Sequence, residues 1–228
     1  MDENRTVSTR QGLIYENGGF HPEERTLVRE EIWRVTVNGR EAGSFACSPV
    51  QMQDAAVGFL FLNVMLASLD ELKSLELLPE SREIRAAVRM DAKCPDCRAP
   101  AVKICAAKVE KLLSWLENQR EKGVHSCALI QGENLVFRSD VSRGTAVDKA
   151  AGACLRQGIE TENTILVFSG RVPEGIVTKC ARMGCKLIVA RSGPTDLACE
   201  LAEKAGITIV GHAGPGRFCV YTCPERMI

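Results

Sequence analysis

Two cysteines three residues apart, Cys94 and Cys97, are the side chains of this sequence whose types and spacing best suit chemistry. Two thiols at this spacing can share a metal ion, close a small disulfide ring, or pass a sulfur atom from one to the other. They can also be an incidental pair in a chain with 11 cysteines. The positive charges of Lys93 and Arg98, which flank the pair, favour the reactive thiolate form.

A zinc site at this pair would need two further ligands from elsewhere in the chain. The candidates form no second closely spaced cysteine pair, and they are His125, Cys127, Cys219 and Cys223. We therefore expect no metal site. His125 is instead a candidate to act on a thiolate, either through its charge or by moving a proton.

The overall charge and the apolar stretches of the chain narrow the class of protein. Basic and acidic residues number 29 each, so bulk charge does not favour nucleic acid or an anionic membrane as a partner. The longest apolar stretch, residues 57–69, is interrupted by Asn63 and is too short to span a bilayer. The N-terminus has no apolar signal segment, and the cysteines are scattered and odd in number. These features predict a cytoplasmic protein with free thiols.

The elements that precede the cysteine pair predict a β-rich N-terminal subdomain with helices over residues 29–90. Residues 1–28 are polar without clear periodicity, which indicates an arm or an irregular extension. Apolar and polar residues then alternate around Asn38-Gly39, a pair typical of a hairpin turn. Ser48 as a cap and Pro49 at the first helical position predict a helix. The expected elements are strands at 31–37 and 44–47, a helix from Ser48 to about residue 67, a second helical start at 68–72 and a strand at 84–90.

The elements that follow the pair predict an α/β core over residues 91–228. Short apolar strands alternate there with helices of about ten residues, a pattern typical of parallel βαβ units with both sheet faces covered. An amphipathic helix and a hairpin come first. The expected elements are a helix at 101–119, hairpin strands at 127–130 and 135–137, strands at 164–168, 186–190, 207–210 and 218–221, and helices at 174–183 and 195–205.

The loops that follow three of these strands are rich in arginine and glycine. Ligands of such sheets bind at the C-terminal ends of the strands, where arginines and backbone N–H groups suit a phosphate or pyrophosphate. Neither nucleotide-binding glycine motif is present. The expected anion-binding residues are Arg171 in the first loop, Arg191 beside Ser192 in the second, His212, Gly214, Gly216 and Arg217 in the third, and Arg143 at a neighbouring helix start. The remaining charges of that helix start, residues 140–149, are typical of solvated surface.

Several segments, in one order along the chain, resemble the formate dehydrogenase accessory sulfurtransferase family, called FdhD or NarQ. The resemblance extends from about Glu31 to Met227. The matching segments are Val37-Asn38-Gly39, Ser48-Pro49, Gly58-Phe59-Leu60, Asp140-Val141 with Arg143, Ala146-Val147-Asp148-Lys149, Ser169-Gly170-Arg171, Ser192-Gly193-Pro194-Thr195, Gly206-Ile207-Thr208 and Tyr221-Thr222-Cys223-Pro224-Glu225-Arg226.

This resemblance implies a fold and a function. The fold would be a cytidine-deaminase-like three-layer α/β/α core with a smaller β-rich N-terminal subdomain. The function would be that of a sulfur carrier that accepts persulfide sulfur from a cysteine desulfurase and transfers it to the molybdenum bis(guanine dinucleotide) cofactor. The matured cofactor would then enter the catalytic subunit of formate dehydrogenase.

The resemblance also assigns residues and partners. By position, Cys94 would carry the persulfide and Cys97 would be its partner. The cofactor-binding loop would be His212, Ala213, Gly214, Pro215, Gly216 and Arg217. A homodimer is expected. The alternative is a non-catalytic chaperone for the molybdenum cofactor, in which the two thiols are structural or bind zinc.

Overall fold

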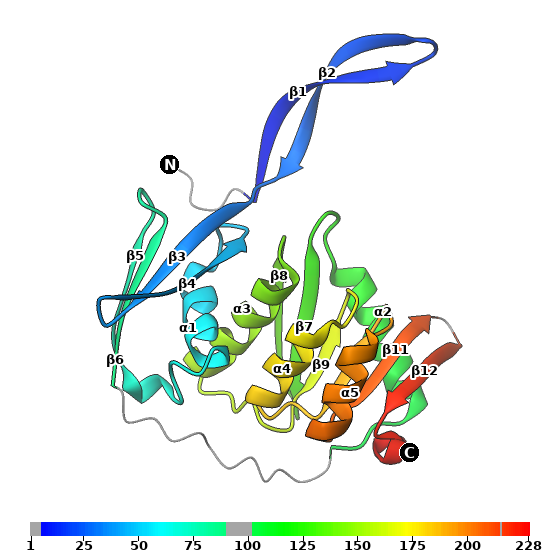
Figure 1. Ribbon diagram of the computed structural model, residues 1–228. Coiled ribbons are helices and arrows are strands. Elements are labelled where there is room, and N and C mark those ends of the chain that lie inside the picture. The colour runs from blue at the N-terminus through cyan, green and yellow to red at the C-terminus, as the bar shows by residue number, and fades with distance from the viewer. Residues whose placement is uncertain (1–5, 90–101, 215) are drawn as a thin grey trace.

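The computed structural model describes residues 6–89, 102–214 and 216–228. These residues form three β-sheets and five α-helices, and the sheet with the most strands lies in the C-terminal half (Figure 1). Cys94, Cys97 and Pro215 lie outside the described residues. Within the described ranges, no helix is long and apolar enough to cross a membrane.

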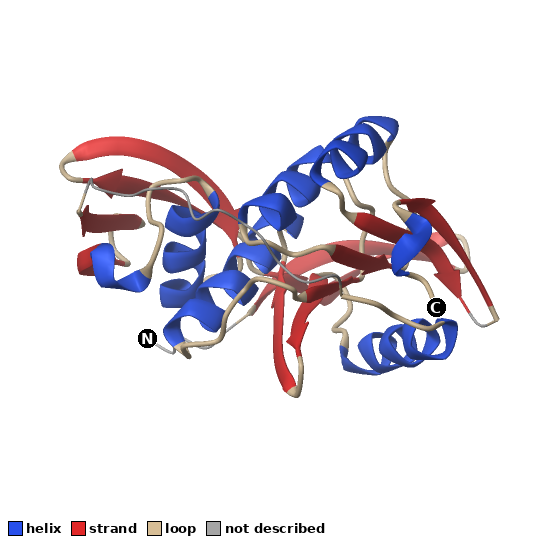
Figure 2. Cartoon of the chain, turned by 90° about the horizontal axis from the view of Figure 1, so that it is seen from below, coloured by secondary structure: helices blue, strands red, loops and turns tan. Residues whose placement is uncertain are grey.

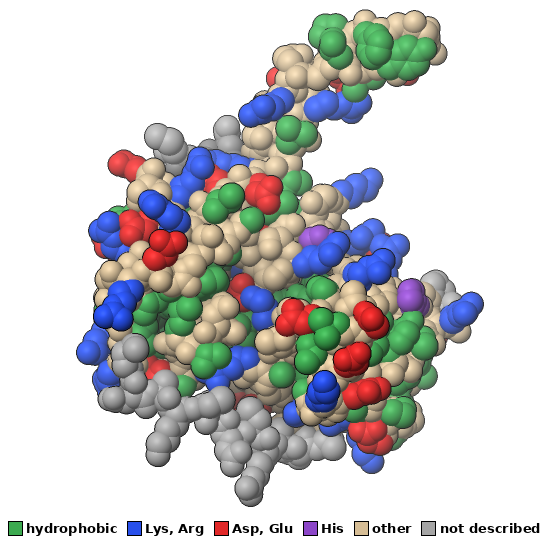
Figure 3. Space-filling model, in the orientation of Figure 1, with side chains coloured by type: hydrophobic (Ala, Val, Ile, Leu, Met, Phe, Trp, Pro, Cys, Tyr) green, Lys and Arg blue, Asp and Glu red, His purple; other side chains and the backbone are tan. Residues whose placement is uncertain are grey.

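The N-terminal arm is a regular two-stranded hairpin that projects away from the rest of the chain (Figure 1). Strand β1 (Val7–Glu16) pairs with β2 (Gly19–Val28) across an Asn17-Gly18 turn, where both residues have positive φ, as a type I′ turn requires. The expectation of an irregular extension is therefore wrong, although an arm is present. No residue of the hairpin is buried, so its strands need no apolar alternation, and that signal is absent from the sequence. Apolar side chains gather at its tip (Figure 3).

A four-stranded sheet in the order β4-β3-β6-β5 follows the arm. The predicted hairpin is confirmed: β3 and β4 are joined by Asn38 and Gly39, both with positive φ. Alternate residues of β3 and β6 are buried and pack against the first helix. The strands are β3 (Glu31–Val37), β4 (Arg40–Cys47), β5 (Leu72–Leu78) and β6 (Glu83–Val88).

Helix α1 (Met52–Leu62) is shorter than predicted and begins without the expected cap. Gln51 occupies the cap position in a left-handed conformation, and no side chain caps the helix. Ser48 is engaged elsewhere, because its N–H donates to Asp140 Oδ2 (3.1 Å) and its hydroxyl accepts from the N–H of Val141 (3.2 Å). The second helical start forms only a single 3-10 turn at Leu69–Glu71 before β5.

The six-stranded sheet has the order β12-β11-β10-β9-β7-β8 and is mixed. Strands β9, β10 and β11 are parallel to one another, as predicted. The other three strands pair antiparallel with their neighbours: β12 with β11, β7 with β9, and β8 with β7. The third apolar strand extends through Gly214, so much of the expected third glycine loop is part of a β-hairpin. The strands are β7 (His125–Gln131), β8 (Asn134–Asp140), β9 (Ile165–Phe168), β10 (Leu187–Ala190), β11 (Thr208–Gly214) and β12 (Arg217–Thr222).

Helices cover both faces of this sheet (Figure 2). Helix α2 (Ala106–Gln119) packs Val109 and Leu116 on one face, over alternate strand residues such as Val167 and Val189. The other face carries α3 (Arg143–Arg156), α4 (Glu174–Arg182) and α5 (Asp196–Ala205). The predicted α/β fold with a β-rich N-terminal part is thus confirmed. A specific likeness to cytidine deaminases stays a prediction.

Helices α1 and α3 touch through two glycines, and this contact joins the N-terminal part to the core. A Cβ atom on Gly58 would collide with the carbonyl oxygen of Asp148, and one on Gly152 would collide with that of Asp54. Since both obstacles are backbone atoms, no rotamer change can relieve either clash. Glycine is therefore required at both positions.

Gly152→Ala is expected to lower the free energy of unfolding by about 3 kcal/mol, because the added methyl group forces the two helices apart. Gly144→Ala in the same helix is the matched control. A Cβ on Gly144 would lie 3.8 Å from the nearest side-chain atom, an ordinary contact. This control is expected to stay within about 1 kcal/mol of wild type or to be stabilised. Urea unfolding measures both, and equal losses would contradict the close helix contact.

Candidate functional site

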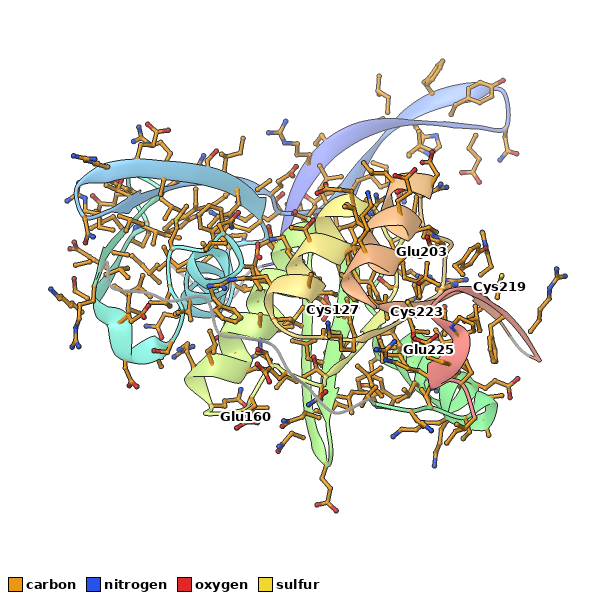
Figure 4. The ribbon with its side chains drawn as sticks, turned by 60° about the horizontal axis from the view of Figure 1, so that its bottom comes forward. Cys127, Glu160, Glu203, Cys219, Cys223 and Glu225 are labelled. Atoms are coloured by element: carbon orange, nitrogen blue, oxygen red, sulfur yellow. The ribbon has the colours of Figure 1, made fainter. Side chains whose placement is uncertain are left out.

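The cysteine pair lies between β6 and α2, outside the described residues, so Cys94 and Cys97 keep their roles as predictions. Nine other cysteines are described, and five of them are buried. Burial raises the pKa of Cys47 to about 12 and that of Cys154 to about 11, which keeps both thiols protonated and unreactive. Among the described thiols, Cys105 and Cys219 are exposed, and Cys219 lies at the outer strand of the sheet (Figure 4).

The predicted zinc candidates are not brought together. Cys127 is buried in the core beneath α3, whereas Cys219 and Cys223 lie on β12 and just beyond it (Figure 4). Over residues 6–89, 102–214 and 216–228, no three His, Cys, Asp or Glu side chains are grouped to hold a metal ion.

The ends of the parallel strands are linked to one another by backbone hydrogen bonds. The N–H of Val172 donates to the carbonyl of Gly193 (3.3 Å), which joins the first loop to the second. The N–H of Ala213 donates to the carbonyl of Arg191 (3.2 Å), which joins the second loop to β11. The loops after β9 and β10 therefore meet β11 at one edge of the sheet, as the topology predicts.

A pocket of about 560 Å³ opens at this edge, between the sheet and α2. Four of the ten predicted cofactor-binding residues line it: Arg191, Ala213, Gly214 and Gly216. Ser169, at the end of β9, also lines it. The sequence did not reveal its second wall, which consists of α2 residues Glu110, Leu113, Ser114, Leu116, Glu117 and Asn118.

The other predicted residues that the structure describes do not line this pocket. Arg171 and Arg217 are exposed outside it. Ser192 packs its backbone against Gly211, where an added Cβ would lie 3.0 Å from the carbonyl oxygen of Ser192. His212 has a positive φ of 48° and packs against Gly193. Its Nδ1 is hydrogen-bonded to the hydroxyl of Tyr221 on β12, which keeps the ring engaged away from the pocket wall.

Arg143 and His125 lie together at the same edge of the sheet, at the start of α3 and of β7. His125 packs against Gly170, where a Cβ would lie 3.3 Å from Nδ1. Burial lowers the pKa of His125, and the charge of Arg143 lowers it further. The imidazole is therefore neutral near pH 7, and its action on a thiolate stays a prediction.

The charged residues 140–149 are largely buried, so the expectation of solvated surface is wrong. Lys149 Nζ lies 2.6 Å from Asp140 Oδ2, and both side chains are fully buried. Asp148 is likewise buried and pairs with Lys179 of α4. Burial raises the pKa of Asp140, and the charge of Lys149 opposes that effect. These ion pairs hold α3 against the end of β8 and against α4.

Among the described residues that line the pocket, Arg191 is the cation, and it is paired with a carboxylate of the opposite wall. Its Nη1 lies 3.3 Å from Oε2 and 3.4 Å from Oε1 of Glu117. Glu117 also accepts a hydrogen bond of 2.9 Å from Nε of Arg120, the residue that directly follows α2. The pocket thus joins one arginine, three residues of the β11–β12 hairpin and a polar helix face.

Residues 89–228, which include the cysteine pair and the whole pocket, match the family model of the FdhD/NarQ family. The chain belongs to this family. It is 30% identical over 238 residues to a sulfur carrier protein FdhD of Shouchella clausii, covering 88% of this chain and 89% of that one. It is 27% identical to the sulfur carrier protein FdhD of Bacillus subtilis, with 98% of each chain covered.

A solved structure agrees with this assignment. The fold matches the crystal structure of a protein from Desulfotalea psychrophila described as a formate dehydrogenase accessory protein, with a TM-score of 0.83 and 25% identity. The match covers 98% of this chain and 100% of that one. The N-terminal hairpin and both larger sheets are therefore nearly all within the shared architecture.

Proposed function

We propose that this FdhD/NarQ protein is a sulfur carrier that accepts persulfide sulfur from a cysteine desulfurase. It passes the sulfur to the molybdenum bis(guanine dinucleotide) cofactor before that cofactor enters formate dehydrogenase. The observation that carries the proposal is the family match over residues 89–228, because it joins the Cys94–Cys97 pair and the pocket in one unit. The names of the relatives in Shouchella clausii and Bacillus subtilis support sulfur transfer.

The first sulfur-transfer step requires a thiolate, which Cys94 supplies. Its sulfur attacks the terminal sulfur of the desulfurase persulfide, so a new S–S bond forms on Cys94 and the desulfurase leaves as a thiolate. In the second step the thiolate of Cys97 attacks the inner sulfur of the Cys94 persulfide. The terminal sulfur then leaves as sulfide with both electrons of the broken bond, and a Cys94–Cys97 disulfide remains for a thiol reductant to reopen.

The cofactor is the substrate in this proposal, and the pocket at the sheet edge is where its anionic part would bind. Arg191 supplies the cation, and Gly214 and Gly216 leave backbone accessible because they carry no side chain. The volume of about 560 Å³ lies within the range of small-molecule sites. The same proposal implies a cytoplasmic homodimer that meets both the desulfurase and formate dehydrogenase.

Arg191→Ala is expected to weaken GDP binding about tenfold. A charge-assisted hydrogen bond contributes roughly 1.5–3 kcal/mol, and the low end applies because Arg191 is half exposed. Arg171→Ala is the matched control, since Arg171 follows the neighbouring strand but does not line the pocket. Its affinity for GDP should equal that of wild type. Calorimetry with GDP measures both variants, and an unchanged affinity in folded Arg191→Ala would place the anionic group elsewhere.

A further inference from the structure

Glu117 lies in the position that an anionic ligand group would need in front of Arg191. Both oxygens of the carboxylate are within 3.4 Å of the same guanidinium nitrogen, Nη1. The two side chains are each about half exposed, and both residues line the pocket. A phosphate that approaches this nitrogen from the pocket therefore meets the carboxylate and competes with it for Nη1.

We infer that Glu117 is an internal competitor that sets the anion affinity of the pocket, an inference that rests on the proposed function. Arg120 makes the exchange feasible. Its Nε already donates to Glu117 Oε1 at 2.9 Å, a shorter contact than either contact with Arg191. When an anion binds Arg191, Glu117 keeps a cationic partner in Arg120, at the C-terminal end of α2, and is not left as an unpaired charge beside the ligand.

Competition of this kind lowers the affinity of every anion that uses Arg191 by the same factor. Weakly bound anions such as inorganic phosphate are then kept out of the pocket. A ligand with further contacts, such as a nucleoside diphosphate, still binds because those contacts are unaffected. The ratio of affinities between two such anions is unchanged, but at a given concentration the pocket is left to ligands that make enough contacts beyond Arg191.

A second acidic residue of the same wall provides the matched control. Glu110 also lines the pocket and lies two turns before Glu117 on α2, but the carboxylate paired with Arg191 is that of Glu117. Glu110→Gln and Glu117→Gln change the charge of the pocket equally. A difference between them therefore reports the ion pair and not the general potential.

The experiment is calorimetry with inorganic pyrophosphate and with GDP on wild type, Glu117→Gln, Glu110→Gln, Arg191→Ala and the double variant Glu117→Gln/Arg191→Ala. Exposed ion pairs contribute little, so Glu117→Gln is expected to bind both probes roughly two- to fivefold more tightly than wild type. Glu110→Gln should gain less. The gain of Glu117→Gln should vanish in the Arg191→Ala background, and it should shrink as salt is added.

Two results would overturn the inference while the proposed function stands. One is an equal gain in Glu117→Gln and Glu110→Gln, and the other is a gain that persists without Arg191, provided that Arg191→Ala still weakens wild-type binding. A pocket that binds neither probe, in wild type and in Glu117→Gln alike, would overturn both the inference and the proposed cofactor site.

Discussion

Lys149→Met is expected to lower the free energy of unfolding by about 3–5 kcal/mol, the usual cost of leaving a buried charge without its partner. The Lys149 and Asp140 side chains are both fully buried, and they lie 2.6 Å apart. Lys149 Nζ also donates to the carbonyl oxygen of Ser48 at 3.0 Å. Methionine fills similar volume but leaves the Asp140 carboxylate buried with only backbone donors from Ser48 and Ser142. Equilibrium unfolding in urea measures the loss.

Two further variants decide whether the ion pair is the cause. Lys111→Met removes an exposed lysine from α2 and should change stability by less than about 0.5 kcal/mol. The double variant Asp140→Asn/Lys149→Met removes both charges and should recover most of the loss, because no buried charge is left unpaired. A double variant as unstable as Lys149→Met would contradict an ion-pair origin and point to lost packing.

This ion pair also shows what the sequence could not reveal. The pattern of residues 140–149 is that of a charged helix start, and such starts are normally solvated. Asp140 is instead covered by Ser48, which lies 92 residues earlier in the chain. No local pattern encodes that distant contact, so the burial of Lys149 was not predictable from its neighbours.

The elements predicted most closely are those whose own residues mark their limits. The strands at 165–168 and 187–190 are short apolar runs buried on both faces, and Gly206 in a left-handed conformation ends α5 as expected. The helix expected from Ser48 is wrong at its start because tertiary hydrogen bonds take the predicted cap. The hairpin at 7–28 was missed because both of its faces are exposed.

The candidate site was predictable in position but not in all its members. The C-terminal ends of parallel strands lie at one edge of the sheet, and Arg191 and Gly214 therefore line the same pocket, as expected. Nothing in the sequence fixes which face of the sheet α2 covers, so its polar wall with Glu117 was not foreseen. Nor does the sequence show that His212 contacts Tyr221, because His212 lies where the register of the β11–β12 hairpin shifts, between Gly211 and Gly214.

Whether Cys94 carries sulfur is decided by following labelled sulfur that a cysteine desulfurase delivers to the protein. The proteins to compare are wild type, Cys94→Ala and Cys105→Ala, with the bound label located by mass spectrometry. Cys105 is a suitable control because its thiol is exposed and lies just before α2, only a few residues beyond the cysteine pair.

We expect stoichiometric persulfide on wild type and on Cys105→Ala, located at Cys94, and none on Cys94→Ala. The nucleophile that receives the sulfur is absent from Cys94→Ala, and the buried thiols of the core stay protonated. Stoichiometric label on folded Cys94→Ala would contradict the assignment of the carrier residue. Wild type that takes up no sulfur and instead holds zinc at the cysteine pair would contradict sulfur transfer altogether and favour a cofactor chaperone with structural thiols.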